Sequence, residues 1–412
     1  RSRFCAILRL TTPRGSSAQC LFPILTRVQQ VSSHMRVLFL HEVNYKTKPV
    51  FEMHEFPEYL SRKGHEVAFM HFPEGTSIQK FGQRNYWKVE EYRRLQKGGS
   101  IQLYTPGTPF SASPLGRIIA AVRAFWLIRA VVREFRPDVV VTYAVPTFGW
   151  QAIILCRQLG IPIAYRAIDV SHQIRQTAFS PLVMLAERFV VKNANLVITN
   201  SPAMNQRCQR FGPRHSVVCP PIISSSQWTL GSRVRSRKQI VFLGSFFRFS
   251  GLQEFVNQFA TSSNEDVRLV LAGAGEEFNN IKQVVKELDL SHRVEMPGWV
   301  DFSDIGSLLQ DSSVAVNPML KLPVTEYALP NKVLQYLLMG LPTVSTRLLG
   351  LESFFGNDPA CSLYFEETPA DVALRALELL EERPKVGKCE VMSEFEESRA
   401  LQTFEKALGD LL

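Results

Sequence analysis

The sequence predicts an α/β protein made of two Rossmann-like, doubly wound units in series that face a cleft. Short apolar, β-branched runs alternate with helical patterns along most of the 412 residues, which is typical of parallel sheets covered on both faces. The alternation stops at a polar, Ser-rich stretch, 224–238, and then begins again. Lys and Arg outnumber Asp and Glu over 35–220, and the reverse holds over 221–412, so charge divides the chain at the same place.

Composition excludes several classes of protein. Hydrophobic residues make up 45% and charged residues 21% of the chain, as in globular proteins rather than collagen-like or low-complexity ones. The seven cysteines contain no C-x-x-C spacing, which argues against a structural zinc site or a disulfide framework and indicates a reducing compartment. No run approaches 18 uninterrupted apolar residues, so we expect no membrane-spanning helix.

The first 34 residues differ from the rest. They contain Arg and Ser but no acidic residue, a composition that resembles a transit peptide. Met35 directly precedes the first predicted strand. We therefore interpret 1–34 as a disordered or non-native extension and Met35 as the natural start.

Residues 35–221 form the predicted N-terminal unit. Its strands are expected at 36–40, 66–70, 101–104, 139–142, 161–166 and 196–199. Its helices are expected at 50–63, 114–135, 149–159 and 181–193, and Gly64 and Gly160 end two of them.

After a linker at 222–238, residues 239–385 form the predicted second unit. Strands are expected at 240–243, 268–272, 294–296, 314–317 and 342–345. Helices are expected at 251–260, 276–289, 304–310, 330–339 and 369–382. Residues 386–412 are expected to form a helical segment that packs back on the N-terminal unit. Ligands of such sheets bind outside the carboxyl ends of the strands, so we expect functional residues in the loops that follow strands.

Ordered motifs run through both halves of the chain. They are, in order, Arg136–Val140 (RPDVV), Ala194–Ser201 (ANLVITNS), Val241–Gly244 (VFLG), Leu269–Glu277 (LVLAGAGEE), Val294–Val300 (VEMPGWV), Asp311–Pro318 (DSSVAVNP) and Pro330–Val344 (PNKVLQYLLMGLPTV). Over residues 35–385, this set resembles the group 1 glycosyltransferases, which have the GT-B fold.

The resemblance implies an enzyme that moves a sugar from a nucleotide-sugar donor to an acceptor hydroxyl, with retention of anomeric configuration. It also implies no divalent metal, and the lack of a D-x-D motif agrees. We expect no cofactor beyond the nucleotide sugar, which is a co-substrate. The acceptor is a sugar, a lipid-linked compound or another hydroxyl compound.

Glycines and an arginine after the first strands of the second unit are candidates for the donor's diphosphate. Backbone N–H groups at Gly244, Ser245 and Gly273 can approach a phosphate closely, and Arg248 supplies a cation. The helix that opens at Gly251 offers its N-terminus as a cradle. Simple tight turns are the alternative interpretation of the glycines.

Four further positions are assigned to the donor. Trp299 and Val300 flank the base, with a core role as the alternative for Trp299. Lys332 lies in the first turn of a predicted helix, where it contributes a point charge to a phosphate; a solvent-exposed Lys is the alternative. One turn later, Gln335 occupies the place where the family has a Glu for the ribose hydroxyls.

Three departures from the family pattern affect the functional prediction. The family's paired glutamates fall on Tyr327 and Gln335, its Lys-Gly falls on Ser250-Gly251, and its glycine-rich first loop reads His41–Tyr45 (HEVNY). They raise the alternative of a catalytically degenerate protein that acts as a binding or scaffold subunit. An epimerase of the same fold is a third interpretation.

Asp169 and His172 follow the fifth predicted strand of the first unit, where a general acid or base would meet the acceptor hydroxyl. The alternatives are a helix cap for Asp169 and a surface position for His172. A group of cations borders the same loops and would meet an acidic acceptor or the donor's phosphates. These cations are Lys46, Lys48, Arg166 and Arg175.

The stretch Arg117–Arg136 interleaves arginines with apolar residues. This pattern is typical of an interfacial helix and also of a Rossmann helix with one buried stripe. We predict a cytoplasmic protein with peripheral contact at the inner membrane surface. No nucleic-acid-binding motif occurs, so nucleic acid is not an expected partner.

Overall fold

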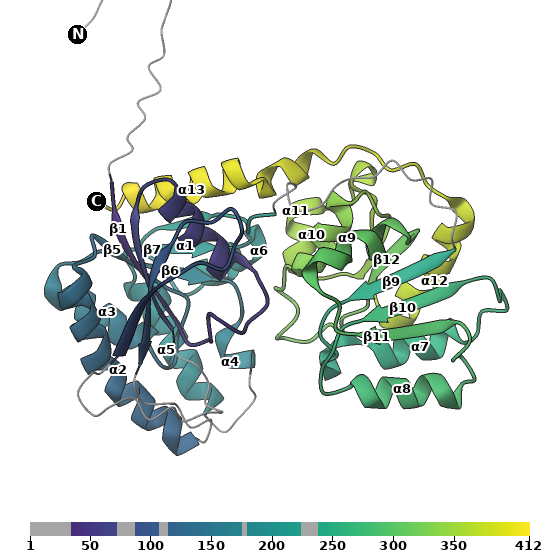
Figure 1. The fold of residues 1–412 in the computed structure, drawn as a ribbon, viewed down its shortest axis with the longest axis horizontal. Helices are drawn as coiled ribbons and strands as arrows, with labels where there is room; N and C mark the ends of the chain where they lie inside the picture. Colours follow the sequence, from purple (N-terminus) through teal and green to yellow (C-terminus); the bar gives the residue numbers. More distant parts are fainter. Residues whose placement is uncertain (1–33, 72–86, 107–113, 175–178, 224–237) are drawn as a thin grey trace, which may run out of the picture. The chain divides into compact units, whose positions relative to one another are not determined.

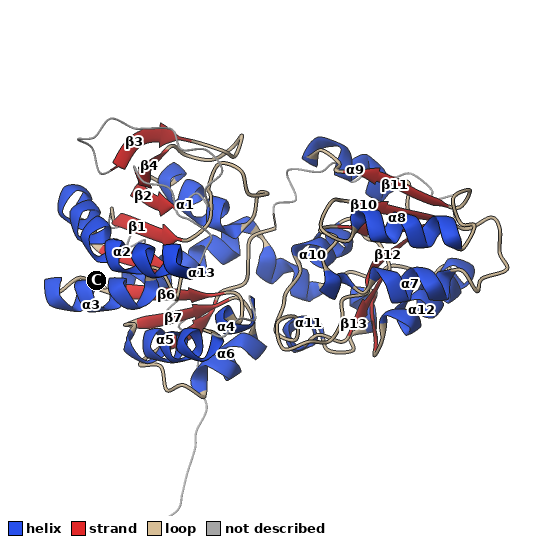
Figure 2. Ribbon diagram, turned by 90° about the horizontal axis from the view of Figure 1, so that it is seen from below, coloured by secondary structure: helices blue, strands red, loops and turns tan. Residues whose placement is uncertain are grey.

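Two sheets of mainly parallel strands organise the chain (Figures 1 and 2). The computed structural model describes residues 34–71, 87–106, 114–174, 179–223 and 238–412, and His34–Leu412 belong to one compact unit. The expected extension, 1–34, and the expected linker, 222–238, lie almost entirely outside the described residues. So does Arg175.

The first sheet is parallel except at β3, which pairs antiparallel with β4. Its spatial order is β3 (Trp87–Tyr92), β4 (Ile101–Pro106), β2 (Glu66–His71), β1 (Arg36–His41), β5 (Val139–Thr142), β6 (Ile163–Ala167), β7 (Leu196–Thr199) and β8 (Ser216–Val218). The central strands β1, β5 and β7 are mainly apolar, as expected for strands that helices cover on both faces.

The helices of this unit form two layers, one on each face of the sheet. Side chains that alternate along β1 contact one layer or the other. Val37 and Phe39 share a core with α1 (Glu52–Arg62) and α13 (Glu397–Gly409). Leu38 and Leu40 face the opposite layer. That layer consists of α2 (Pro114–Phe135), α3 (Gly149–Leu159), α5 (Ser180–Asn193) and α6 (Pro202–Gln209). The short α4 (Ser171–Ile174) lies between β6 and α5 in the chain.

The second sheet is fully parallel. Its order is β11 (Val294–Gly298), β10 (Arg268–Ala272), β9 (Gln239–Leu243), β12 (Val314–Asn317), β13 (Thr343–Thr346) and β14 (Leu363–Glu366). This is the 3-2-1-4-5-6 order of a Rossmann fold. One face packs on α7 (Leu252–Phe259), α8 (Phe278–Glu287) and α12 (Pro369–Glu382), and the other on α9 (Phe302–Gln310) and α10 (Asn331–Leu338). The predicted fold class is confirmed.

The end of the chain returns to the first sheet. Figure 1 shows α13 beside α1 at the first sheet. Phe404 of α13 stacks on Phe56 of α1 at 4.3 Å between ring centroids, and lies 6.2 Å from Phe39. Although α13 follows the second sheet in the chain, it contributes an aromatic ring to the core of the first sheet. Burial of this apolar surface holds α13 against the first sheet.

One disulfide contradicts an expectation from the sequence. Cys361, beside β14, bonds to Cys389 in the segment that leads to α13, although no cysteine motif predicts it. The two residues are 28 positions apart, and only the fold brings them together. The absence of C-x-x-C was therefore insufficient to exclude a disulfide, and it gives no support to a reducing compartment.

No helix among the described residues combines the length and the apolar character that crossing a bilayer requires. The absence of a spanning helix predicted from the sequence holds for that part of the chain.

Candidate donor and acceptor site

One cavity of about 340 Å³ is lined by residues from the carboxyl ends of strands in both sheets. The first sheet contributes Glu52, Asp169 and Asn200 among others, and the second contributes Ser245 and Lys332. Parallel sheets bind ligands at this end because the strand-to-helix loops and the helix N-termini converge there. The cavity therefore lies where the fold predicts a ligand.

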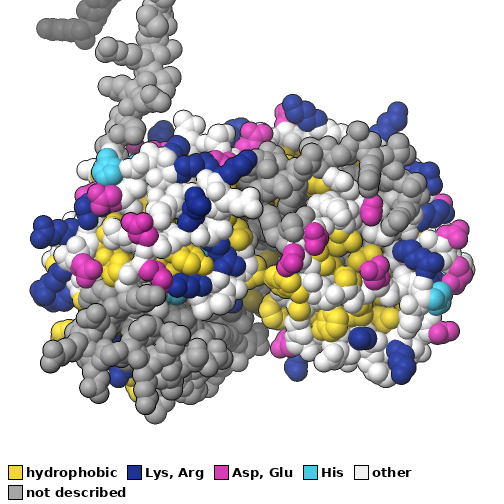
Figure 3. Space-filling model, viewed as in Figure 1, with side chains coloured by type: hydrophobic (Ala, Val, Ile, Leu, Met, Phe, Trp, Pro, Cys, Tyr) yellow, Lys and Arg dark blue, Asp and Glu magenta, His cyan; other side chains and the backbone are white. Residues whose placement is uncertain are grey.

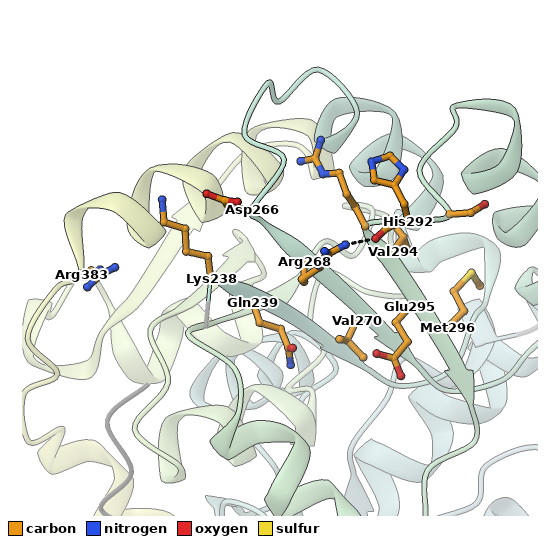
Figure 4. Close-up of a pocket in the computed structure, with 12 residues that line it drawn as sticks. Lys238, Gln239, Asp266, Arg268, Val270, His292, Val294, Glu295, Met296 and Arg383 are labelled. Atoms are coloured by element: carbon orange, nitrogen blue, oxygen red, sulfur yellow. Dashed lines mark hydrogen bonds between the residues drawn. The ribbon is translucent and has the colours of Figure 1, made fainter. Parts of the chain in front are cut away.

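A larger cavity, about 970 Å³, lies at the opposite edge of the second sheet (Figure 4). Its basic side chains are largely engaged by the protein: Lys238 pairs with Glu381, His292 pairs with Glu265, and Arg268 donates to the His292 carbonyl. None of the candidate donor or acceptor residues lines it. We therefore assign no function to this cavity.

Lys332 is the principal cation of the smaller cavity. Burial lowers the pKa of Lys332 to about 7, and its Nζ lies 4.0 Å from the centroid of the Phe242 ring. No carboxylate of the described residues forms an ion pair with it. A partly buried ammonium group without a counter-charge is costly, and a bound anion removes that cost.

The surrounding backbone places Lys332 beside Gly244. The Tyr336 hydroxyl accepts a hydrogen bond from the Leu243 N–H at 2.7 Å, which fixes α10 against the end of β9. A Cβ atom on Gly244 would lie only 3.0 Å from Lys332 Nζ. Lys332 is the second residue of α10, so the positive end of the helix dipole adds to its charge.

The predicted glycines pack the loops after β9 and β10 against each other. A Cβ on Gly273 would lie 1.8 Å from the Gly244 carbonyl oxygen, and Gly273 adopts φ 144°. The Phe246 N–H donates to the Ala274 carbonyl at 2.9 Å. Gly273 thus supports the loop that carries Gly244, as the tight-turn alternative proposed.

Of the remaining donor candidates, Ser245 lines the cavity. Gln335 lies half-buried one turn after Lys332 and is outside the lining. Arg248 does not line the cavity; it is largely exposed and pairs with Glu277 at 3.5 Å. Gly251 is also outside its lining, because it packs tightly against Pro318.

Neither residue of the predicted base subsite lines the cavity. Trp299 follows β11 and is 65% exposed, so the alternative of a core role is wrong. Val300 packs against the apolar cluster formed by β9, β10, α9 and α10.

Asp169 and Glu52 supply carboxylates from the first sheet. Asp169 follows β6 and is exposed to the cavity, while protein atoms enclose most of its surroundings. Burial, followed by the negative charge of Glu52, raises the pKa of Asp169 to about 6. Glu52 accepts two hydrogen bonds from the fully buried Arg166, at 2.8 and 2.6 Å.

His172 belongs to a different group of side chains. Its Nδ1 lies 2.8 Å from Glu187, which also accepts a hydrogen bond from Arg207 at 2.7 Å. Because His172 does not line the cavity, the structure does not bring it together with Asp169 there.

The cations predicted for an acidic acceptor are engaged elsewhere. Arg166 donates to Glu52 and to the Thr199 and Cys219 carbonyls. Lys46 pairs with Glu90, and neither Lys46 nor Lys48 lines the cavity. That expectation is corrected, because the described part of the first sheet presents no free cation to the cavity.

Two family models match the chain. The "Glycosyl transferase 4-like domain" matches residues 53–221, and "Glycosyl transferases group 1" matches residues 237–382. Together they span more than half of the sequence. The chain belongs to the group 1 glycosyltransferases. The resemblance drawn from the motifs and the enzyme class that it implies are thereby confirmed.

Relatives and solved structures agree with this family. An uncharacterized glycosyltransferase of Bacillus subtilis, YqgM, is 24% identical over 226 residues; the match covers 53% of this chain and 63% of that protein. Anabaena HepE in complex with UDP-glucose has a TM-score of 0.68 at 16% identity, covering 92% of this chain and all of that one. Sucrose-phosphate synthase from Thermosynechococcus elongatus has a TM-score of 0.67 at 13% identity, covering 91% and 95%.

The sequence analysis of this glycosyltransferase missed two polar residues on the first-sheet side of the cavity, Glu52 and Asn200. Glu52 is the first residue of α1, where an acidic residue is also favoured by the helix dipole. Asn200 directly follows β7 within the motif ANLVITNS. Its position after a strand was therefore a signal that could have been used.

Proposed function

We propose that this glycosyltransferase moves a sugar from a nucleoside diphosphate donor to an acceptor hydroxyl in the smaller cavity, with retention of configuration. The observation that carries the proposal is the unpaired Lys332 beside Gly244 at the start of α10. Structures of the similar HepE hold UDP and UDP-glucose, which makes UDP the first probe for this chain.

Lys332 and the α10 N-terminus hold the diphosphate. When the bond between the sugar's anomeric carbon and the diphosphate breaks, negative charge develops on the leaving phosphate oxygen. A fixed cation that meets this charge stabilises the transition state more than the ground state. Lys332 thus supplies the charge that a divalent metal provides in other enzymes.

Asp169 receives the acceptor. With a pKa of about 6, it is mainly ionised at neutral pH and can accept the hydrogen of the acceptor hydroxyl. The hydroxyl oxygen then forms the new bond to the anomeric carbon, on the face that the nucleotide leaves.

Transfer or hydrolysis of a panel of nucleotide sugars, followed by NMR of the product anomer, tests the reaction. We expect a retained anomer and full activity in excess EDTA. An inverted product or a strict metal requirement contradicts the proposal. A thermal-shift screen tests the scaffold alternative, because a degenerate donor site gives no stabilisation by any nucleotide up to millimolar concentration.

Replacing Gln335 with Glu is expected to tighten UDP binding. A carboxylate accepts charge-assisted hydrogen bonds from ribose hydroxyls, and these are roughly twice as strong as neutral ones. Calorimetric titration of the parent and Gln335→Glu proteins with UDP measures the effect. Weaker binding to the variant would show that Gln335 is an adaptation to this chain's donor.

We also propose peripheral contact of the first sheet's helices with an anionic membrane. Acidic and basic side chains are interspersed on the face of the molecule seen in Figure 3. Helix α2 differs, because its only acidic residue is Glu134 and because Val122 and Trp126 are 59% and 72% exposed. Helix α5 exposes Leu182 and Leu185. Helix α3 contacts both helices. Apolar side chains with neighbouring arginines suit a membrane interface.

Charge reversal on α2 tests this contact. Arg123→Glu combined with Arg129→Glu is expected to reduce co-sedimentation with phosphatidylglycerol vesicles about ten-fold or more, since each basic residue near the surface contributes about 1 kcal/mol. Lys282→Glu combined with Lys286→Glu on α8 changes the net charge equally and serves as the control. Equal binding of the parent to neutral and anionic vesicles contradicts the proposal.

A further inference from the structure

Among the described residues, the part of the cavity wall that comes from the first sheet presents side-chain hydrogen-bond acceptors. Asn200 is 6% exposed and lines the cavity. Its Nδ2 donates to the Ile168 carbonyl at 3.1 Å, while its Oδ1 has no partner among the described residues. The bond to a carbonyl fixes the amide orientation, since only the NH₂ group can donate. A buried oxygen without a partner is costly, so a ligand donor is the partner that it lacks.

Asp169 adds a second acceptor beside Asn200. The two residues follow the adjacent strands β6 and β7, and both line the cavity. No side chain of the described residues forms an ion pair with Asp169. The other residues that the first unit contributes to the cavity lining are mainly apolar: Phe51, Ile168 and Pro221.

Arg166 of β6, three residues before Asp169, cannot supply a positive charge to a ligand. Arg166 is fully buried, and the carboxylate of Glu52 balances its charge through two hydrogen bonds. Its Nη1 is also engaged, by the Thr199 and Cys219 carbonyls at 3.1 and 2.7 Å. The described residues on this side of the cavity therefore carry a net negative charge.

We propose that Asp169 and Asn200 form an acceptor subsite for the hydroxyl groups of an uncharged sugar, and that it rejects sugars with a carboxylate or phosphate near the reacting hydroxyl. The inference rests on the proposed function of the cavity. Hydroxyl groups donate to both oxygens, whereas an anionic acceptor adds a like charge beside Asp169. This specificity is the reverse of the acidic acceptor considered from the sequence.

A matched acceptor panel tests the charge preference. Methyl glycosides of glucose, galactose, mannose and N-acetylglucosamine are compared with methyl glucuronide, methyl galacturonide and glucose 6-phosphate, at saturating donor, with release of the nucleoside diphosphate as the readout. We expect at least one neutral glycoside to exceed every anionic sugar about ten-fold or more in kcat/KM. A preferred anionic acceptor overturns the proposal, and so does a lack of transfer to every neutral glycoside.

Asn200→Ala tests the subsite itself. We expect the KM of the neutral acceptor to rise about ten-fold, as for loss of one hydrogen bond in a desolvated site, with unchanged UDP affinity. Asn205→Ala is the matched control, because Asn205 Oδ1 also lacks a partner but lies on α6 outside the cavity lining. It should leave the acceptor KM unchanged.

The outcomes separate this inference from the proposed function. An unchanged acceptor KM in Asn200→Ala, with normal UDP binding, overturns the acceptor subsite alone. Weaker binding of the nucleotide sugar with unchanged UDP affinity also overturns it, since Asn200 then contacts the donor's sugar. Failure of the parent protein to bind any nucleoside diphosphate refutes the proposed function instead.

Discussion

Lys332→Ala is expected to weaken UDP binding by about 1.5–3 kcal/mol, the range for loss of a hydrogen bond to a charged group. Lys332 has no carboxylate partner among the described residues, and burial lowers its pKa to about 7. The free protein therefore holds this cation at a cost that the diphosphate removes. Calorimetric titration of parent and variant with UDP measures the change.

Two further variants make the result specific. Lys332→Met retains the contact with the Phe242 ring while removing the charge, so it should bind UDP as weakly as the alanine variant. Lys321→Ala removes an exposed Lys that pairs with Glu367 at 2.6 Å, and it should bind UDP like the parent. If Lys332→Ala binds UDP as the parent does, the donor site is elsewhere.

The pH dependence of UDP binding follows from the same group. Lys332 is charged below its pKa of about 7, and a bound diphosphate favours the charged form and raises that pKa. The contribution of Lys332 to affinity is therefore complete below pH 7 and declines as the pH rises through 7. Lys332→Met should remove this decline, because methionine places no ionisable group at this position.

The donor half of the site was accessible from the sequence because its pattern is local. Gly244 follows an apolar run, and Lys332 lies at the start of a helical pattern. Both could therefore be located from the sequence without knowledge of the fold. What the sequence could not show is that Tyr336 fixes this helix to the end of β9, or that Arg248 extends away to Glu277. Such contacts depend on which side chains meet after folding.

The acceptor half was less accessible for the same physical reason. Asp169 and His172 are three residues apart, but the chain turns into α4 between them, and His172 contacts Glu187 instead of lining the cavity. Arg166 looked like a free cation until the structure showed Glu52, 114 positions away, bound to it. The other strands of both sheets followed closely from short apolar, β-branched runs, whereas β3 and β8 of the first sheet and β14 of the second were missed.

Glu52→Ala is expected to destabilise the protein by about 3–5 kcal/mol, the largest effect on stability that we predict. Removing the carboxylate leaves the Arg166 guanidinium fully buried without a counter-charge, because its other partners are neutral carbonyls. Urea unfolding followed by circular dichroism measures the loss. Glu66→Ala is the control: Glu66 pairs with Arg36 at 2.9 Å, but both side chains are over a third exposed, so less than about 1 kcal/mol should be lost.

A double replacement separates charge from packing in this prediction. Glu52→Leu with Arg166→Met removes both charges and retains most of the volume, so it should recover much of the stability lost in Glu52→Ala. Recovery follows if the cost in the single variant is the unpaired buried cation. If the double variant is as unstable as Glu52→Ala, the unpaired charge is not the main cost. The hydrogen bonds that Arg166 donates to Glu52 and to the Thr199 and Cys219 carbonyls, all absent from the double variant, then contribute more to stability than the charge balance does.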